Sequence, residues 1–448
     1  MADTMSNADL SKTWFGQPRG LTILFLTEMW TEFSFFGMRA LLVYYMTKEL
    51  LFSQTHSSLV YGLYGSLVYF TPLIGGAISD RWLGRKTAVI LGGSIMAAGH
   101  FMMAFPPLLY FALATIAVGN GLFLPSLPSQ INLLYAEGDP RRTSAYNIYY
   151  VGINVGAFLA PFACGTVGEW YGWHWGFTLA GIGMVAGLIV YLAGQRYLPQ
   201  DERRAESASK PAVKVSEHFS GRVYAVLGAV IFIVVIFRAA YEQSGNTVAL
   251  WADSGVDRAV HGIGSIPMTW FQSLNPAFIF LLTPAIVSIW TRLGRRGREP
   301  GDVMKMAVGA FLVSASYLVL AGAALWSEQS HTPSHWLWLV GYFVVYTIGE
   351  LFILPVGLGL FGRLAPPSMA ATMIAAWFMA SFAGNFAAGV LGALWGAISP
   401  STFFALTAFV SAVSGGLLLG LSPWSRQLMA APRPDAVEMA RTATATLH

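Results

Sequence analysis

The hydrophobic positions of this 448-residue chain are gathered into long apolar segments, which shorter polar stretches separate. A helix needs about 20 mostly apolar residues to cross the hydrocarbon core of a bilayer. Twelve segments meet that requirement, so the pattern predicts an all-α membrane protein with twelve transmembrane helices. We expect these helices at residues 21–47, 57–79, 86–105, 108–136, 143–167, 174–196, 220–251, 266–292, 303–326, 336–363, 369–396 and 401–422.

The longest polar stretch between two of these segments runs from Pro199 to Ser220 and follows the sixth. It separates two halves of six helices each. A short pattern, Thr-Pro followed by Leu-Gly-Arg, recurs at the ends of the second and eighth segments. Related halves are typical of transporters in which a central site opens to the two sides in turn. We predict an N-terminal half at 1–198, a cytoplasmic linker at 199–219, a C-terminal half at 220–424 and a cytoplasmic tail at 425–448.

The few charged residues indicate how the chain is oriented. Only 11% of the residues are charged, whereas soluble domains carry about a quarter. Cytoplasmic loops of membrane proteins are enriched in Lys and Arg. With both termini placed in the cytoplasm, 22 of the 26 Lys and Arg residues fall in inner segments, while Lys48 and Arg258 fall in outer loops. We therefore expect a multi-pass protein of the bacterial inner membrane with both termini cytoplasmic. The basic excess then reflects these loops and not a nucleic-acid partner.

Catalytic and metal-binding patterns are lacking in the sequence. Cys164 is the single cysteine, which excludes an intrachain disulfide and a cysteine-based metal cluster. No Gly-x-Ser-x-Gly, His-Glu-x-x-His or phosphate-loop pattern is found in the 448 residues. We expect no metal, no cofactor and no enzymatic activity.

The first apolar segment contains Glu28, Glu32 and Arg39. A charged side chain at mid-membrane costs about 2.5–3.5 kcal/mol on insertion scales, so it is retained where it has a use. One interpretation is a polar cluster that fixes helix packing. The other is a pathway through the membrane for protons or a charged solute.

The stretch GGAISDRWLGRK after the second segment resembles the signature loop of the major facilitator superfamily. Its glycines allow close helix approach, and its acid and bases lie at the inner surface. This loop contributes the conformational motif residues Gly75, Asp80, Arg81, Gly84, Arg85 and Lys86.

Further stretches resemble the proton-coupled oligopeptide transporter family of that superfamily. They extend from the first helix to the eleventh: EMWTEFSFFGMRALL, GNGLFLPSLPSQINLLY, DPRRTSAYNIYYVGINVGAFLAP, YEQSGN, WFQSLNPAFIFLLTPAIVSIWTRLGRRG and GELFILPVGLGLFGRLAP. The resemblance implies the two-half transporter fold. Many bacterial members carry two extra helices between the halves, but the linker here is too short and polar for them, so we expect twelve.

The chain departs from the family pattern at one end of the expected site. The family's first-helix motif reads Glu-x-x-Glu-Arg-Phe-x-Tyr-Tyr-Gly, but Thr31 stands at the second acid and Glu32 at the arginine. In the fourth helix, Leu124 stands where the family usually has a lysine. The resemblance assigns that arginine and lysine to the peptide carboxylate and to proton coupling. Both cations are missing, so we expect an altered carboxylate site.

The other end of the site is retained. By resemblance, Glu350 receives the substrate ammonium, and Glu28 matches the first acid of the first-helix motif. We expect Glu28 and Glu350 to be the proton-coupling acids, Glu350 because burial without its usual cation favours the protonated form. The asparagines among the expected site residues have an alternative role in joining helices, and the aromatic residues an alternative role in ordinary packing. The expected substrate-binding residues are Glu32, Tyr69, Asn154, Asn275, Glu350 and Trp377.

Arg39 and Glu242 match residues that pair across the extracellular side of the cavity in the family. We expect this pair to act as a gate that breaks on opening, with a static pair as the alternative. Arg238 lies four residues before Glu242 on the same helix and is placed to compete for it.

We therefore expect a secondary active transporter, a monomer, that moves peptides or peptide-like solutes together with protons. An alternative follows from the acids Glu28, Glu32 and Glu350, which favour a cationic or amine-bearing solute without a free carboxylate. A second alternative is a membrane sensor that binds peptides without moving them.

Overall fold

A computed structural model describes residues 13–136, 139, 141–199, 221–260, 262, 264–364 and 370–430, without the side chains of 143, 362–364, 370–374 and 428–430. The predicted linker beyond residue 199 and the predicted tail beyond residue 430 lie outside this description.

The first half of the chain is helical almost throughout. Short π or 3-10 segments extend several helices, and one of them begins at Pro128, where the missing backbone N–H ends regular α-helix. The helices are α2 (Arg19–Tyr44), α3 (Gln54–Ile78), α4 (Arg85–Met102), α5 (Leu109–Ser126), α6 (Arg141–Ala160), α7 (Thr166–Tyr171) and α8 (Trp173–Gly194). The short segments are η1 (Tyr45–Glu49), η2 (Ser79–Leu83), η3 (Pro106–Leu108), η4 (Pro128–Leu134), η5 (Pro161–Gly165) and η6 (Gln195–Tyr197).

The second half has the same character. Its helices are α9 (Gly221–Tyr241), α10 (Thr247–Ser254), α11 (Leu274–Arg295), α12 (Asp302–Ser330), α13 (Leu337–Leu364), α14 (Ala370–Gly392) and α15 (Pro400–Ala430). Two 3-10 segments join them, η8 (Glu242–Gly245) and η9 (Met268–Ser273).

These helices match the twelve predicted segments in place and order. Ten helical stretches among the described residues are long and apolar enough to cross a membrane. The other two predicted segments correspond to α2 and α4, which carry more charged or polar residues. The prediction of an all-α membrane protein is confirmed, and the count of twelve is consistent with the structure. The main difference lies at α15, which continues to Ala430 instead of ending near residue 422.

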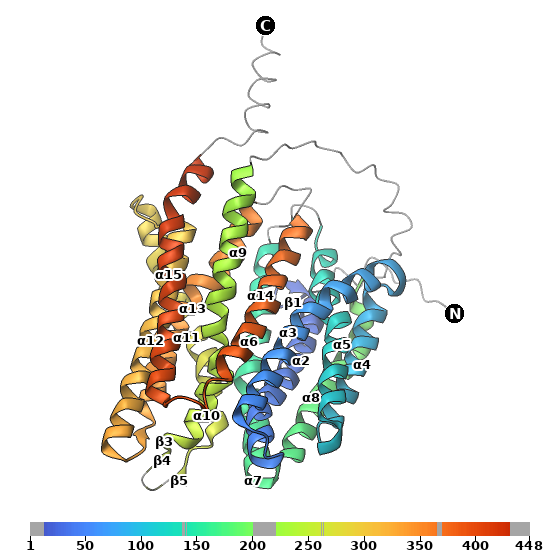
Figure 1. The fold of residues 1–448 in the computed structure, drawn as a ribbon. Coiled ribbons are helices and arrows are strands. Elements are labelled where there is room, and N and C mark those ends of the chain that lie inside the picture. The colour runs from blue at the N-terminus through green and yellow to red at the C-terminus, as the bar shows by residue number, and fades with distance from the viewer. Residues whose placement is uncertain are drawn as a thin grey trace.

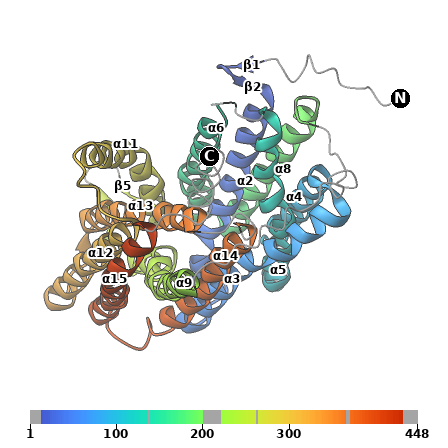
Figure 2. The same cartoon turned by 90° about the horizontal axis from the view of Figure 1, so that it is seen from above.

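The two halves repeat one packing scheme. In the first half α2 packs on α6 and α8, α5 on α3 and α4, and α4 on α8. In the second half the corresponding helices make the corresponding pairs: α9 packs on α14 and α15, α13 on α11 and α12, and α12 on α15. Figure 2 shows the two groups side by side, with α3 and α14 adjacent where they meet. The repeated pairing is the structural counterpart of the sequence repeat.

Short two-residue strands complete the fold. β1 (Thr13–Trp14) pairs antiparallel with β2 (Gln17–Pro18), and Thr13 lies opposite Pro18. At the other end of the molecule, at the bottom of Figure 1, lie β3 (Val256–Asp257), β4 (Ala259–Val260) and β5 (Gly264–Ser265). β3 pairs parallel with β6 (Ser334–His335), and β4 pairs antiparallel with β5.

The hydrophobic core shows where the halves are joined. One continuous cluster of buried side chains contains Leu41 and Met46 near the end of α2, together with residues from the whole second half such as Val230 and Tyr317. Leu21 and Leu24, near the start of α2, belong to a separate cluster within the first half. The halves therefore share a core at the end of the molecule where α2 and α9 end, which we call the latch end.

The approach of α3 to α14 at the latch end depends on glycine. A Cβ atom built on Gly62 would lie 2.4 Å from the Cα of Gly389, closer than atoms in contact allow. Both positions are therefore restricted to glycine as long as the helices remain in contact.

We predict that Gly62→Ala lowers the thermal unfolding midpoint of the purified protein, because overpacking a close contact costs about 1–3 kcal/mol. Gly322→Ala is the matched control, since nothing lies within 4 Å of a Cβ at that helical position and alanine favours helix over glycine by about 0.5–1 kcal/mol. Equal midpoints for Gly62→Ala and Gly322→Ala would show that the close approach is not required.

Candidate functional site

A buried carboxylate at the latch end binds two arginines from different halves. Glu242, the first residue of η8, accepts a hydrogen bond from Arg39 Nη2 of α2 at 2.6 Å through one oxygen. Its other oxygen accepts from Arg238 Nη1 of α9 at 2.8 Å. Arg238 and Glu242 are one turn apart and therefore lie on the same face. The expected competition between the arginines is not seen, since Glu242 binds both at once.

Two tyrosines from α3 complete this cluster. Tyr61 accepts a hydrogen bond from Arg39 Nε at 2.6 Å. The guanidinium carbon of Arg238 lies 5.3 Å from the ring centroid of Tyr69, a cation–π arrangement. The cluster holds two guanidinium groups and one carboxylate, so one positive charge is not neutralised by an acid within it. We call Arg39, Arg238, Glu242 and these two tyrosines the latch cluster.

A second polar centre is formed where α11 meets α13. Asn275 donates from Nδ2 to Glu350 at 2.5 Å and to the Thr347 hydroxyl at 3.1 Å. Glu350 is 8% exposed, so its carboxylate is almost completely removed from solvent. Tyr241, at the end of α9, also interacts with it. The carboxylate is thus held by neutral polar groups from two neighbouring helices.

Close packing of α13 fixes the position of Glu350. A Cβ on Gly349 would lie 2.7 Å from the carbonyl oxygen of Gly309 in α12. A Cβ on Gly92 of α4 would similarly lie 2.6 Å from the carbonyl oxygen of Gly119 in α5. α4–α5 is the pair that corresponds to α12–α13 in the first half. The repeat therefore includes the contact that orients Glu350.

The other expected site residues lie at varying distances from Glu350. Asn154 of α6 donates to the carbonyl oxygen of Tyr150, one turn earlier, and Tyr150 is an electrostatic neighbour of Glu350. Trp377 instead packs on α13 about three turns beyond Glu350, with its ring centroid 5.4 Å from that of Phe361. The structure therefore connects Asn154 to this centre and puts Trp377 at its edge.

The two acids of α2 lie one turn apart on one helix face and precede Arg39 on the same helix. Glu28 is 2% exposed, and its neighbour from α6 is Tyr149. Glu32 is partly exposed and lies near Glu28 and Arg39. Leu124 of α5 is partly exposed as well, so it supplies an apolar surface at the position expected for a cation.

The signature loop lies at the opposite end of the molecule from the latch cluster. Gly75 packs on α5, where its Cβ would lie 2.1 Å from the carbonyl oxygen of Gly121. Gly84 has a φ of 77° and precedes the first residue of α4, a conformation that favours glycine. Lys86 donates to the carbonyl oxygen of Leu198 at 3.4 Å. Asp80 and Arg81 are exposed, and Arg85 is partly buried.

The structure reveals an ionic network that sequence analysis did not identify. Asp253 of α10 binds Lys48 at 2.7 Å and approaches Arg258 at 3.6 Å. Arg258 in turn lies 3.9 Å from Glu169 of α7. Lys48 and Arg258 are the two basic residues assigned to outer loops. Because basic residues are rare there, their presence could have indicated that they pair with acids.

Glu169 of the first half also binds backbone N–H groups of the second half. Its carboxylate accepts hydrogen bonds from the backbone N–H groups of Met268 and Thr269 at 3.1 and 2.9 Å. The Thr269 hydroxyl donates to it at 2.6 Å. η9 is thereby held against α7.

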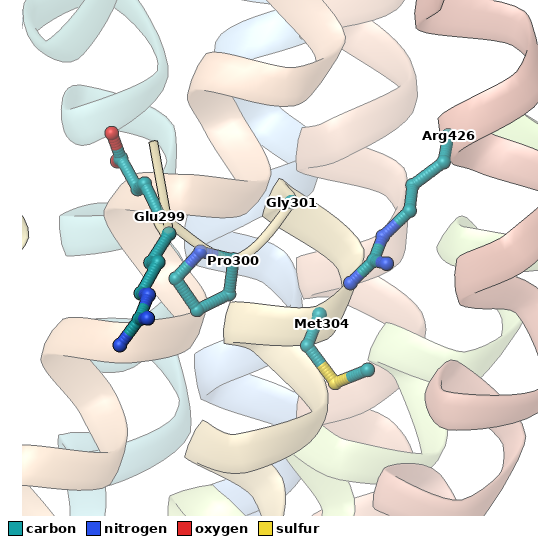
Figure 3. A pocket seen from close by; sticks show the side chains of 6 residues that line it. Glu299, Pro300, Gly301, Met304 and Arg426 are labelled. Atoms are coloured by element: carbon teal, nitrogen blue, oxygen red, sulfur yellow. The ribbon is translucent and has the colours of Figure 1, made fainter. Parts of the chain in front are cut away.

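A surface hollow of about 590 Å³ is formed by the α11–α12 loop and the end of α15. Figure 3 shows Glu299 and Arg426 on either side of Pro300 and Gly301. None of the expected site residues is among those that line the hollow, which are Arg298, Glu299, Pro300, Gly301, Met304 and Arg426.

Comparison with known proteins identifies the family. The sequence model described as the POT family matches residues 86–224 and 221–404. A di-/tripeptide transporter of Lactococcus lactis subsp. cremoris is 32% identical over 480 residues, covering 91% of this chain and 96% of its own. A peptide transporter of Yersinia enterocolitica is 31% identical, covering 87% and 90%.

Solved structures agree with this assignment. A peptide transporter POT in complex with sulfate superposes with a TM-score of 0.83 at 30% identity, covering 93% of this chain and 97% of the other. A POT family transporter in complex with 5-aminolevulinic acid gives a TM-score of 0.81 at 25% identity, covering 92% and 98%. The matches cover nearly the whole of each protein, and the chain is a membrane transporter that belongs to the POT family.

Proposed function

We propose that this protein takes up peptides or peptide-like solutes together with protons. The observation that carries the proposal is the buried Glu350, which accepts a hydrogen bond from Asn275 and forms no salt bridge among the described residues. Such a carboxylate is suited to receive a substrate ammonium group, because a charged hydrogen bond is stronger than a neutral one. Relatives named as di-/tripeptide transporters support peptides as the substrate class.

Proton coupling is supported by buried acids at membrane depth. Glu28 and Glu350 are both nearly inaccessible, and intramembrane acids commonly form proton pathways in transporters. One proton moving down 100 mV yields about 2.3 kcal/mol. That energy allows roughly fifty-fold accumulation of a neutral solute.

The transport cycle consists of rocking between halves, and the described contacts suit a conformer closed at the latch end. Besides the latch cluster, Ser58 of α3 donates to Asn246 at 3.2 Å, and Thr55 donates to the carbonyl oxygen of Ala393 at 3.0 Å. We assign the latch end to the extracellular side of the bacterial inner membrane and both termini to the cytoplasm. The concentration of Lys and Arg in the opposite loops supports this assignment.

An amine-bearing solute without a free carboxylate is a second candidate. Glu28 and Glu32 lie one turn apart on α2, and Leu124 provides no charge. A substrate carboxylate beside Glu32 would be repelled: at an effective dielectric near 20, two like charges about 4 Å apart oppose each other by roughly 4 kcal/mol. Peptides therefore require a cation elsewhere if they bind as free acids.

We predict that Glu350→Gln lowers peptide binding and proton-driven uptake by about tenfold or more, because a charged hydrogen bond contributes about 1.5–3 kcal/mol. Uptake into proteoliposomes and equilibrium binding provide the measurement. Glu328→Gln is a matched control, since Glu328 binds the backbone of Ser401 and lies outside the site. Normal accumulation by Glu350→Gln would contradict the amine-site role.

We predict that Glu28→Gln separates coupling from exchange. The variant should lose accumulation driven by an inward proton gradient, because it removes a proton carrier, yet retain exchange of substrate across proteoliposomes in counterflow. Retained concentrative uptake would rule out Glu28 as the coupling acid.

We predict that Glu242→Gln opens the latch end, because it leaves the buried Arg238 and the partly buried Arg39 without their shared carboxylate. Removal of one partner from a buried pair costs about 3–5 kcal/mol. A cysteine introduced as Ser58→Cys, where the native side chain is fully buried, should then react faster with a membrane-impermeant thiol reagent. The native Cys164 is buried and gives a low background.

The double change Arg39→Gln with Glu242→Gln should partly reverse this increase, because it also removes one stranded cation. Arg238→Ala reports how much of the attraction comes from the second arginine. Strictly additive effects of Arg39→Gln and Glu242→Gln on the reaction rate would indicate that the pair is not a gate.

A further inference from the structure

Arg238 has hydrogen-bonding capacity that the latch cluster does not use. The residue is 6% exposed, and its Nη1 donates to Glu242. Its Nε is buried and has no hydrogen-bond partner among the described residues. A buried donor without a partner costs free energy, and a guanidinium presents its donors in a fixed fork that matches a carboxylate. An anion that binds Arg238 would satisfy this donor.

Charge in the latch cluster favours the same ligand. Arg39 and Arg238 share the carboxylate of Glu242, which leaves one positive charge without an acid in the cluster. The neighbouring Tyr61 contributes a hydroxyl, and Tyr69 contributes a ring and a hydroxyl that also interacts with Arg238. None of these groups carries a full negative charge. Beyond the cluster, Glu32 is an electrostatic neighbour of Arg39, and Glu350 of Arg238. Neither acid forms a direct ion pair with these arginines among the described residues, so a carboxylate at the Nε of Arg238 would supply a partner that they do not.

The packing of Arg238 holds it in place. A Cβ on Gly384 of α14 would lie 2.5 Å from the Cβ of Arg238 and 3.0 Å from its Cδ. The absence of a side chain at Gly384 leaves room for the aliphatic part of Arg238. The ring of Tyr69 covers the guanidinium from α3. A cation fixed in this way loses little conformational freedom when a ligand binds.

Arg238 is also positioned beside the proposed amine site. Arg238 lies within one turn of Tyr241 on α9, and Tyr241 interacts with Glu350. Arg238 and Glu350 are also electrostatic neighbours of each other. Arg238 on α9 and Glu350 on α13 therefore provide a cation and an acid that lie near each other. A peptide has the complementary pair, an ammonium group at one end and a carboxylate at the other.

We propose that Arg238 binds the carboxylate of the substrate, replacing the cations that Glu32 and Leu124 do not supply. This inference rests on the proposed peptide transport and specifies its substrate class, namely short peptides or peptide-like solutes with both a free amine and a free carboxylate. Both ends of the substrate are then held by the second half of the chain, the ammonium by Glu350 and the carboxylate by Arg238.

The test compares dialanine with dialanine amide, which differ only in the carboxylate. Equilibrium binding of each is measured by calorimetry for the unmodified protein and for Arg238→Gln. We expect the unmodified protein to bind the free acid about tenfold to a hundredfold more tightly, the range of a charged hydrogen bond. Arg238→Gln should remove that preference by weakening the acid, with the amide affinity changed by less than about threefold.

Two variants distinguish this role from a purely structural one. Glu242→Gln disturbs the latch cluster but leaves Arg238 more available, so it should keep or increase the preference for the free acid. Arg426→Gln removes an exposed arginine at the end of α15 and should leave the preference unchanged. If Arg238→Gln is not recovered as folded protein, Arg238→Lys, which lacks the Nε donor, takes its place, and the preference should fall.

The outcomes separate this inference from the function on which it rests. An unchanged acid-to-amide ratio in Arg238→Gln, or in Arg238→Lys when that variant takes its place, overturns the inference alone and leaves peptide transport standing. A preference of the unmodified protein for the amide overturns the inference and favours the amine-bearing solute. Failure of the unmodified protein to bind either compound overturns peptide transport and the inference together.

Discussion

The attraction between the Glu242 carboxylate and two guanidinium groups is the interaction on which the closed latch end depends. Arg39 comes from the first half, while Arg238 and Glu242 come from the second. Around them the halves are otherwise joined by neutral hydrogen bonds, by a shared apolar core and by an ionic network at the surface. Exposed ion pairs contribute about 0–1 kcal/mol, whereas a buried charge that loses its partner destabilises strongly. Among these contacts, the buried cluster is therefore the one whose disruption costs most free energy.

The latch cluster and Glu350 are mechanically connected through the end of α9. Tyr241 interacts with Glu350 and stacks on Tyr346, with ring centroids 5.1 Å apart. The Tyr346 hydroxyl in turn donates to the backbone carbonyl of Tyr241 at 2.8 Å. A displacement of Glu242 moves its neighbour Tyr241, and with it the surroundings of Glu350. Tyr241 and Tyr346 thus form a continuous set of contacts between the latch cluster and Glu350.

The sequence predicted the helices well because each is a long apolar run bounded by polar or proline-containing stretches. The pairing of Arg39 with Glu242 was also anticipated, but through family resemblance, since the two residues are 203 positions apart. The sequence did not predict that Glu242 binds both arginines. The i, i+4 spacing of Arg238 and Glu242 does not tell whether the carboxylate pairs with one cation or with two. The network around Asp253 was missed for a different reason. Its partners, Lys48 of η1 and Arg258 after β3, are far apart in the sequence and come from different halves.

Glu169 holds η9 chiefly through the backbone amides of Met268 and Thr269. This kind of contact determines which substitutions the latch end can accept. A bond to a backbone N–H survives almost any substitution of the residue that provides it, proline excepted. These two bonds therefore do not depend on which side chain stands at position 268 or 269, whereas they do depend on the acid at position 169; the Thr269 hydroxyl adds a third bond that requires its own side chain. A proline at position 268 or 269 would therefore break the contact between η9 and α7 even where its side chain could be accommodated.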